Sequence, residues 1–171
     1  MSSFTRNIFF VIFVLFQVIT FGQEHTLHQI QKKVQDIEKD TSLIMTEVDW
    51  VILTGITTDG GGILKVWHQD GQISKIMEEI GLSYGRVRTT IYLDNRVPIK
   101  IIETEENFEK NNQGFNYKNL HEVFKVTIHI FNWNEGLEEI ERKGKRVFTE
   151  RPCSTFEYES TLERAEKAIK K

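Results

Sequence analysis

The stretch GGILKVWHQDGQISKIMEEIGLSYGRVRTTIYLDNRVPIKII, residues 61–102, decides the fold class of this chain. Apolar and polar residues alternate along it, which is the pattern of strands that bury one face. Short segments rich in Asp, Asn and Gly interrupt the alternation at residues 69–71 and 94–95, and a small-residue loop does so at residues 81–84. Asn, Asp and Gly tolerate the positive φ angles of tight turns. The stretch therefore predicts an antiparallel β-meander.

The residues on both sides of this stretch extend the prediction. The apolar run at residues 51–53 is consistent with a further strand, and residues 103–122, rich in Asn and Lys, are expected to form a polar loop or lobe. Alternation returns at residues 123–131. Residues 134–136 then turn the chain into a strand over residues 137–141. The side chains expected to point inward between these positions are Phe124, Val126, Ile128 and Ile130.

Two amphipathic helices are expected to flank the strands. Apolar residues recur at steps of three and four between Thr26 and about Asp40, and again near the end of the chain, as on one stripe of a helix. The two stripes are Leu27, Ile30, Val34 and Ile37, and Tyr158, Leu162, Ala165 and Ile169. Ser154 or Ser160 is the candidate cap of the second helix. The predicted fold class is α+β, an antiparallel β-meander sheet of about five to seven strands flanked by an N-terminal and a C-terminal helix, with both helices on one face.

The first 22 residues have the pattern of an export signal. A single basic residue, Arg6, precedes an apolar run that ends at Phe21, and the small residues Thr20 and Gly22 occupy the positions that a signal peptidase needs. The run is shorter than the roughly 18 residues of a helix that spans a bilayer. We therefore expect cleavage after Gly22, and no stable membrane insertion afterwards.

The expected organisation is a signal peptide over residues 1–22 and a single α+β domain over residues 23–171, in the periplasm or secreted. The chain has 22 Lys and Arg against 25 Asp and Glu, a net charge of −3. This balance argues against nucleic acid and against anionic lipid as partners, because both need a concentrated basic surface. Cys153 is the only cysteine, which excludes an internal disulfide. Because no cysteine stands at the start of the expected mature chain, a lipid anchor is disfavoured as well.

A family resemblance follows from the order of motifs in residues 59–102. A glycine pair opens a strand, Trp67 precedes the Asp70-Gly71 turn, a Lys-Ile return follows, and a second aromatic strand end leads to a second turn. This pattern resembles small exported bacterial, Bacteroidetes-like proteins of unknown function with an antiparallel hairpin sheet. The resemblance implies the order of elements and export, and it implies no catalytic or ligand-binding residues. The chain differs from the pattern at residues 94–96, where Asp-Asn-Arg replaces Asn-Gly.

Motifs for cofactors and metals are weak, and we predict neither. The glycines at residues 60–62 lead into a strand and not into a helix, which favours a bulge or close backbone approach over a phosphate site. His25 and His28 are three residues apart but lack a third ligand. His129 would form an acid–base pair with Glu103 or Glu105 if their strands adjoin.

The candidate binding site is a strand face that mixes cations with aromatic side chains. Arg86, Arg88 and Tyr92 alternate on one strand, and Trp67 and Lys75 are expected nearby. The sequence predicts no catalytic residues, and the leading hypothesis is a non-enzymatic binding module that presents this face to an unknown protein or envelope ligand.

Three alternatives stay open. In the first, the strand face is only a solvated surface. In the second, the protein is a small periplasmic hydrolase that uses Cys153 or a His–Glu pair. In the third alternative, residues 103–122 form the loop with which the chain inhibits a secreted hydrolase.

Overall fold

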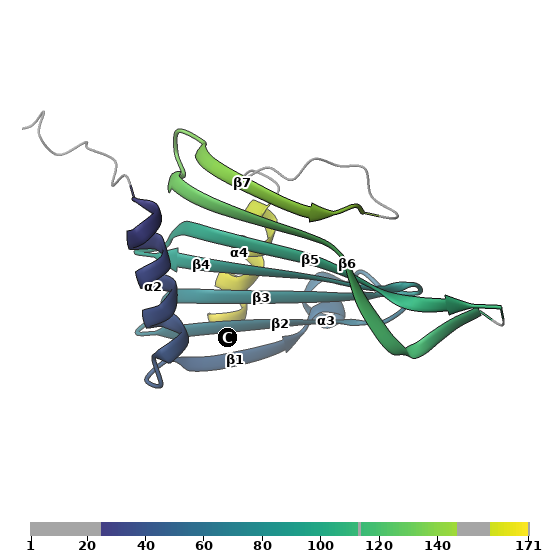
Figure 1. The fold of residues 1–171 in the computed structure, drawn as a ribbon. Coiled ribbons are helices and arrows are strands. Elements are labelled where there is room, and N and C mark those ends of the chain that lie inside the picture. Colours follow the sequence, from purple (N-terminus) through teal and green to yellow (C-terminus); the bar gives the residue numbers. More distant parts are fainter. Residues whose placement is uncertain (1–24, 113, 147–157, 171) are drawn as a thin grey trace, which may run out of the picture.

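The computed structural model describes residues 25–112, 114–146 and 158–170. Its seven strands form one antiparallel sheet in the order β1-β2-β3-β4-β5-β6-β7, so each strand pairs with its neighbour in the sequence (Figure 1). The predicted α+β meander is confirmed. The elements are α2 (Leu27–Lys39), β1 (Ile44–Asp49), α3 (Trp50–Thr54), β2 (Gly62–Gln69), β3 (Gln72–Leu82), β4 (Gly85–Asp94), β5 (Val97–Asn111), β6 (Gly114–Asn132), β7 (Leu137–Gly144) and α4 (Glu159–Ile169).

Three hairpins are built alike at the end of the sheet beside α2. The turns of the first two hairpins contain Asp70 and Gly71, with φ of 51° and 75°, and Asn95 and Arg96, with φ of 50° and 69°. Each of the three hairpins has a register shift close to its turn, between residues 67 and 68, 92 and 93, or 130 and 132. These bulges change which face the following side chains occupy. Both faces of the sheet therefore carry apolar side chains at this end.

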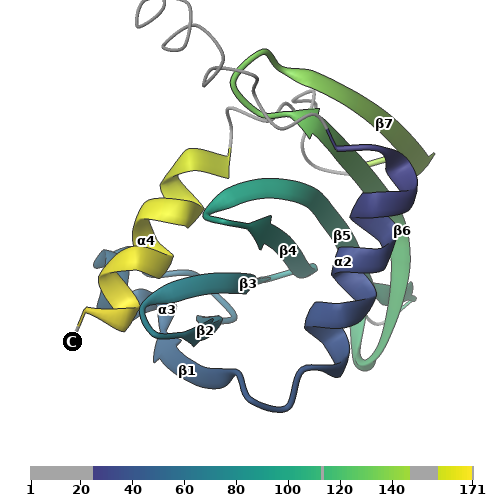
Figure 2. The same cartoon turned by 90° about the vertical axis from the view of Figure 1, so that its left-hand side faces the viewer.

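The two terminal helices lie on opposite faces of the sheet, so the prediction of one shared face is wrong (Figure 2). On one face, Ile30 and Ile37 of α2 pack with Tyr92 and Ile99. On the other face, α4 covers the larger cluster, which includes Leu64, Ile76, Ile91, Ile101 and Ile128. An apolar stripe requires a covered surface but does not specify which face supplies it. Here each face offers one, because the bulges redistribute the side chains.

Residues 51–53 are helical, and the strand before them is β1. Asp49 caps α3 by accepting a hydrogen bond from the backbone N–H of Ile52 at 2.9 Å, and Gly55 ends the helix with φ of 72°. Tyr158 occupies the cap position of α4 without a side-chain cap bond, and Ser160 lies inside the helix. The alternative cap Ser154, the signal segment 1–22 and Cys153 lie outside the described residues.

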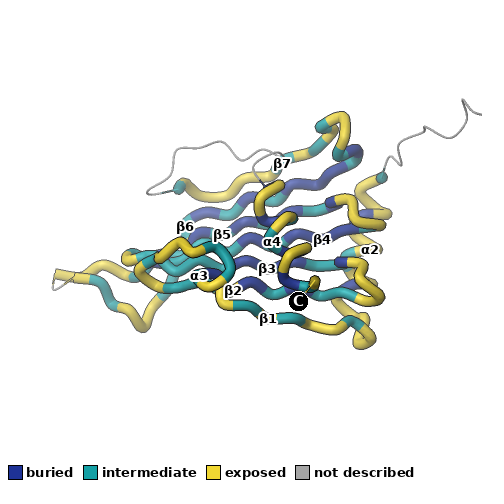
Figure 3. The backbone as a smooth tube through the Cα atoms, turned by 180° about the vertical axis from the view of Figure 1, so that it is seen from behind, coloured by how far each residue is buried: buried dark blue, intermediate teal, exposed yellow. Residues whose placement is uncertain are grey.

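The prediction of a polar loop over residues 103–122 is wrong, because residues 103–111 belong to β5 and residues 114–122 belong to β6. Glu103, Glu105 and Asn107 alternate with more exposed residues and are 9%, 2% and 9% exposed. A strand pattern is thus present, with polar side chains on the buried face. The inward positions of β6 were predicted correctly, since Phe124, Val126, Ile128 and Ile130 are all buried. Figure 3 shows such buried positions, in dark blue, along the central strands of the sheet.

Candidate functional site

Helix α2 covers part of the predicted binding face. Lys75 Nζ lies 2.7 Å from Glu38 Oε1 of α2, and the Tyr92 hydroxyl donates to the same oxygen at 2.5 Å. Lys75 Nζ also lies 4.6 Å from the centroid of the Trp67 ring and 5.6 Å from that of Tyr92. Tyr92 is only 6% exposed, so its predicted exposure is wrong. Two of the five candidate residues, Lys75 and Tyr92, therefore hold α2 against the sheet, and Trp67 packs against Lys75.

The pKa values of Tyr92 and Glu38 are consistent with a structural role for this contact. Burial raises the pKa of Tyr92, and the hydrogen bond and charge of Glu38 raise it further. Burial acts to raise the pKa of Glu38 as well, but the hydrogen bonds from Lys75 and Tyr92 and the charge of Lys75 outweigh it and lower the pKa. The carboxylate stays ionised beside its cation.

Arg86 and Arg88 occupy the opposite end of the same face, which α2 leaves uncovered. Arg88 Nη2 lies 2.7 Å from Glu79 Oε2, Arg86 Nη1 lies 3.5 Å from Glu79 Oε1, and Arg86 forms a second ion pair with Glu106. The hydrogen bond to Glu106 raises the pKa of Arg86. Two arginines and two carboxylates balance each other here. This end of the face therefore has no surplus of positive charge with which to attract an anion.

A cleft of about 500 Å³ adjoins this ion-pair network. Its lining combines backbone of glycines, apolar and aromatic side chains, and a few polar groups. The lining residues are Asp59, Gly60, Gly62, Ile63, Glu79, Gly81, Leu82, Ser83, Gly85, Arg86, Phe108, Tyr117 and Leu120. The cleft thus joins the ends of β2, β3 and β4 to the outer part of the β5–β6 hairpin, and Arg86 is the one predicted site residue that lines it.

The glycine run that is conspicuous in the sequence shapes one rim of the cleft. The backbone N–H of Gly60 donates to Gly81 at 3.2 Å, and that of Gly81 donates to Gly61 at 2.9 Å. A Cβ atom on Gly81 would lie 2.5 Å from the carbonyl oxygen of Gly60. Only glycine permits so close an approach of two backbones. The expected role of residues 60–62 in a close backbone contact is confirmed.

The β5–β6 hairpin extends beyond the rest of the sheet (Figures 1 and 3). It carries a cluster of aromatic side chains. Its register passes from Phe108 opposite Leu120 to Glu109 opposite Asn116, so residues 117–119 bulge out of β6. The rings of Phe108 and Tyr117 meet edge to face with centroids 5.0 Å apart, and those of Phe115 and Tyr117 are 6.3 Å apart. Tyr117 is 67% exposed.

The role of these aromatic residues was not predicted from the sequence. The surrounding Asn, Lys and Glu residues lowered the apolar content of residues 103–122 and concealed the strands. The available signal was the recurrence of large apolar side chains at Phe108, Phe115, Tyr117 and Leu120 within an otherwise polar segment. Their convergence depends on a hairpin bulge, which no local pattern specifies.

The predicted pair of His129 with Glu103 or Glu105 does not form. Glu103 is opposite Val126 and Glu105 is opposite Phe124 in the β5–β6 register, whereas His129 is opposite Lys100. Directly opposed residues share a face and successive residues alternate, so His129 lies on the other face from both carboxylates. Burial and the charge of Lys100 lower the pKa of His129, against the opposing charges of two carboxylates on β7.

The inward carboxylates hold α4 and its neighbours in place. Glu78 accepts from the indole of Trp50 at 3.0 Å, from Thr161 at 3.3 Å and from Arg164 at 2.7 Å through each of two nitrogens. Glu103 accepts from Thr89 at 3.4 Å and from the Tyr158 hydroxyl at 3.2 Å, and it pairs with Arg146. These bonds satisfy charges that would otherwise be costly to bury.

Neither a metal site nor a membrane-spanning helix is found among the described residues. Across residues 25–112, 114–146 and 158–170, no three His, Cys, Asp or Glu side chains gather as they would around a metal ion. Among these same residues, no helix has the length and apolar character needed to cross a membrane.

The chain has no detected relative. No protein-family model matches it, and comparison with curated proteins and with solved structures gives no significant match.

Proposed function

We propose that the protein is an exported, non-enzymatic binding module that holds an apolar side chain of a protein partner in the cleft beneath the β5–β6 hairpin. The observation that carries the proposal is the combination of a cleft of about 500 Å³ with an aromatic residue, Tyr117, that is 67% exposed at its wall. Exposed aromatic side chains around a concave surface are typical of protein–protein contacts, where Tyr, Trp and Arg contribute most of the binding energy.

The electrostatics of the cleft favour this kind of ligand. Arg86 and Glu79 are already paired with each other, and Arg86 also pairs with Glu106. A charged ligand would have to break these pairs, whereas an apolar group can enter beside them and cover Phe108 and Leu120. The paired groups then serve as a polar rim that excludes water from the contact.

A peptide-display selection tests the proposal directly. A random peptide library is selected on the domain, and the dissociation constants of the peptides are measured for the wild type and for Tyr117→Ala. We expect selected peptides to share an apolar or aromatic anchor and to lose about tenfold or more in affinity with Tyr117→Ala, as for a residue that contributes strongly to an interface. Lys118→Ala is the matched control, because Lys118 is exposed beside Tyr117 and does not line the cleft.

Two results would contradict the proposal. One is that the library yields no peptide whose binding depends on Tyr117. The other is that Lys118→Ala weakens binding as much as Tyr117→Ala does, which would indicate a contact with the hairpin surface and not with the cleft.

The export component rests on the N-terminal segment and is tested separately. Expression of the full chain with a C-terminal tag, followed by cell fractionation and mass spectrometry, is expected to give a periplasmic or secreted protein that begins at Gln23. Recovery in the membrane fraction with residues 1–22 intact would contradict cleavage.

The projecting hairpin also favours a second candidate, an inhibitor of a secreted hydrolase that inserts the end of this hairpin into the active site. In that case the contact is made by exposed residues near the β5–β6 turn, such as Lys110 and Asn111, and not by the cleft. A Lys110→Ala and Asn111→Ala double variant would then abolish inhibition of a hydrolase panel, whereas Tyr117→Ala would reduce it less.

A further inference from the structure

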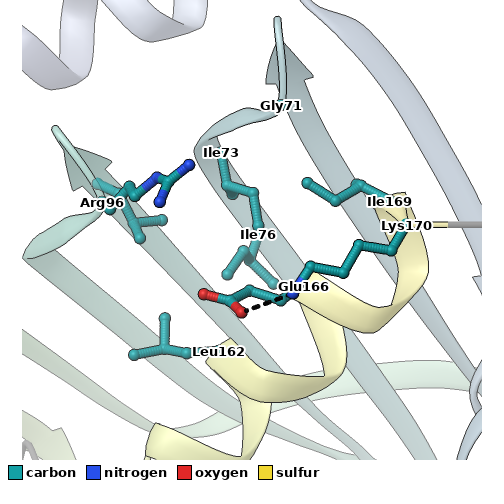
Figure 4. Close-up of a pocket in the computed structure, with 9 residues that line it drawn as sticks. Gly71, Ile73, Ile76, Arg96, Leu162, Glu166, Ile169 and Lys170 are labelled. Atoms are coloured by element: carbon teal, nitrogen blue, oxygen red, sulfur yellow. Dashed lines mark hydrogen bonds and ion pairs between the residues drawn. The ribbon is translucent and has the colours of Figure 1, made fainter.

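A second, smaller pocket lies between α4 and the sheet, on the face opposite to the cleft (Figure 4). Its volume is about 160 Å³, and the β2–β3 and β4–β5 turns lie at its edge. The sheet contributes Ile73, Ile76 and Leu93, which are 8%, 0% and 5% exposed. Helix α4 contributes Leu162 and Ile169. The interior is therefore aliphatic and shares no residue with the cleft.

The mouth of the pocket carries charge. Figure 4 shows Arg96 on the sheet side of the opening and Glu166 and Lys170 on the helix side. Lys170 Nζ lies 3.4 Å from Glu166 Oε2. Within the described part of the chain, Arg96 has no hydrogen bond or ion pair, so the mouth has one positive charge in excess.

The β4–β5 turn requires a positive φ at position 96, but it does not require a residue with a side chain there. Arg96 has φ of 69°, in the left-handed region that disfavours side chains with a Cβ atom. The corresponding turn of the β2–β3 hairpin has Gly71 there, with φ of 75°. A strained position that persists without a compensating internal contact points to a functional role. Here the strained residue is the unpaired cation at the mouth of an apolar pocket.

We propose that this pocket binds an amphiphilic monoanion, with an aliphatic chain of about five carbons inside the pocket and a carboxylate on Arg96. The volume sets the size of the chain, because an aliphatic cavity of about 150 Å³ holds one benzene molecule. The planar guanidinium matches a carboxylate through two parallel hydrogen bonds. Glu166 at the same mouth repels additional negative charge, which disfavours dianions such as phosphate monoesters. The site is independent of the partner-binding cleft.

Titration with hexanoate tests the proposal on the folded domain. The chemical shifts of the methyl groups of Ile73, Ile76, Leu93 and Leu162 are followed by NMR, with hexylammonium and acetate as comparison ligands. We expect saturable, millimolar binding of hexanoate, weaker binding of hexylammonium because of Arg96, and no methyl shifts with acetate because it has no chain to fill the pocket.

Arg96→Asn is the informative variant, because asparagine tolerates the positive φ of this position and removes the guanidinium group with its charge. It is expected to weaken hexanoate binding about threefold to tenfold, the range of an ion pair that is only partly shielded from water, while hexylammonium binding stays unchanged or improves. Lys118→Asn removes a distant exposed cation and serves as the matched control. Thermal melting confirms that both variants are folded.

Three results would overturn the proposal: no saturable methyl shifts with hexanoate, equal affinity for hexanoate and hexylammonium, or hexanoate binding that Arg96→Asn leaves unchanged. Tyr117→Ala tests whether the pocket is independent of the cleft. Because Tyr117 lines the cleft and not this pocket, hexanoate binding by Tyr117→Ala is expected to equal that of the wild type. Failure of one proposal therefore leaves the other unaffected.

Discussion

At the scale of single residues, Glu78 shows how the fold manages a buried charge. Its side chain is 6% exposed, and Arg164 of α4 meets it with two nitrogens while Trp50 and Thr161 donate further hydrogen bonds. Position 78 follows the apolar alternation of β3, so the carboxylate points into the sheet–helix interface by register. Its partners come from α3 and α4, which are distant in sequence. The bond network therefore joins three elements at one carboxylate.

Removal of Arg164 alone is expected to be strongly destabilising. Arg164→Leu leaves Glu78 as an uncompensated buried charge, which costs about 3 kcal/mol or more of the free energy of unfolding. The double variant Glu78→Leu and Arg164→Leu is expected to recover most of that loss, because no unpaired charge remains. Urea unfolding measures both effects, with Lys167→Leu, an exposed position on the same helix, as a control that changes stability by less than about 0.5 kcal/mol. A double variant no more stable than Arg164→Leu would contradict this account.

At the scale of elements, the turns of the first two α2-side hairpins show one geometry with different sequences. Gly71 and Arg96 occupy the same left-handed position in two successive hairpins, with φ of 75° and 69°. The turn conformation follows from the right-handed twist of the strands, which selects turns with positive φ. Glycine meets that requirement without strain, and arginine does not. The β2–β3 turn, with Gly71, therefore meets only the conformational requirement. The β4–β5 turn, with Arg96, also places a charged side chain at the pocket mouth.

Opposite substitutions at these two turns are expected to have opposite effects on stability. Arg96→Gly removes the strain of a left-handed L-residue and is expected to raise the free energy of unfolding by about 0.5–1 kcal/mol. Gly71→Ala introduces that strain, with no atom within 4 Å of the new Cβ to add a clash, and is expected to lower it by about 1 kcal/mol. Thermal or urea unfolding measures both. If both substitutions raised, or both lowered, the free energy of unfolding, backbone strain would not be the factor that determines stability at these two positions.

At the scale of the whole molecule, the sheet separates two apolar layers. Ile30 belongs to the layer under α2, and Ile76 belongs to the layer under α4. Both residues are 0% exposed. Because the sheet lies between them, the two layers share no packing partner in the buried clusters. The two proposed binding sites follow the same division: the cleft lies beyond α2 on one face, and the aliphatic pocket lies under α4 on the other.

Substitutions in the two layers are expected to act independently. Ile30→Val and Ile76→Val each lose one buried methylene and are expected to cost about 0.5–1.5 kcal/mol. The double variant is expected to equal their sum within about 0.5 kcal/mol, as for sites without shared partners. A coupling of more than about 1 kcal/mol in urea unfolding would show that the layers are linked through the sheet.

Much of the fold was predictable from local patterns. The alternation at residues 123–131, the turns at Gly71 and Gly136, and the helical stripe of Ile30 and Ile37 all correspond to observed elements. The failures have one cause in common. In residues 103–122 and at residues 51–53, the conformation depends on partners elsewhere, since inward polar side chains need bonds from other elements and Asp49 begins a helix where a strand was expected.

The candidate site was only partly predictable for the same reason. Arg86 was identified from its strand face, but the aromatic residues that complete the cleft lie more than twenty positions further along the chain. The sequence by itself determined the strands, the turns and the amphipathic helices, because periodicity and turn chemistry act between near neighbours. Only the tertiary structure decided which face each helix covers, that α2 buries Tyr92, and that a bulged hairpin brings Tyr117 into the cleft that Arg86 also lines. Those outcomes depend on bulges and on packing between distant segments, where the free energy is decided by contacts that no local pattern encodes.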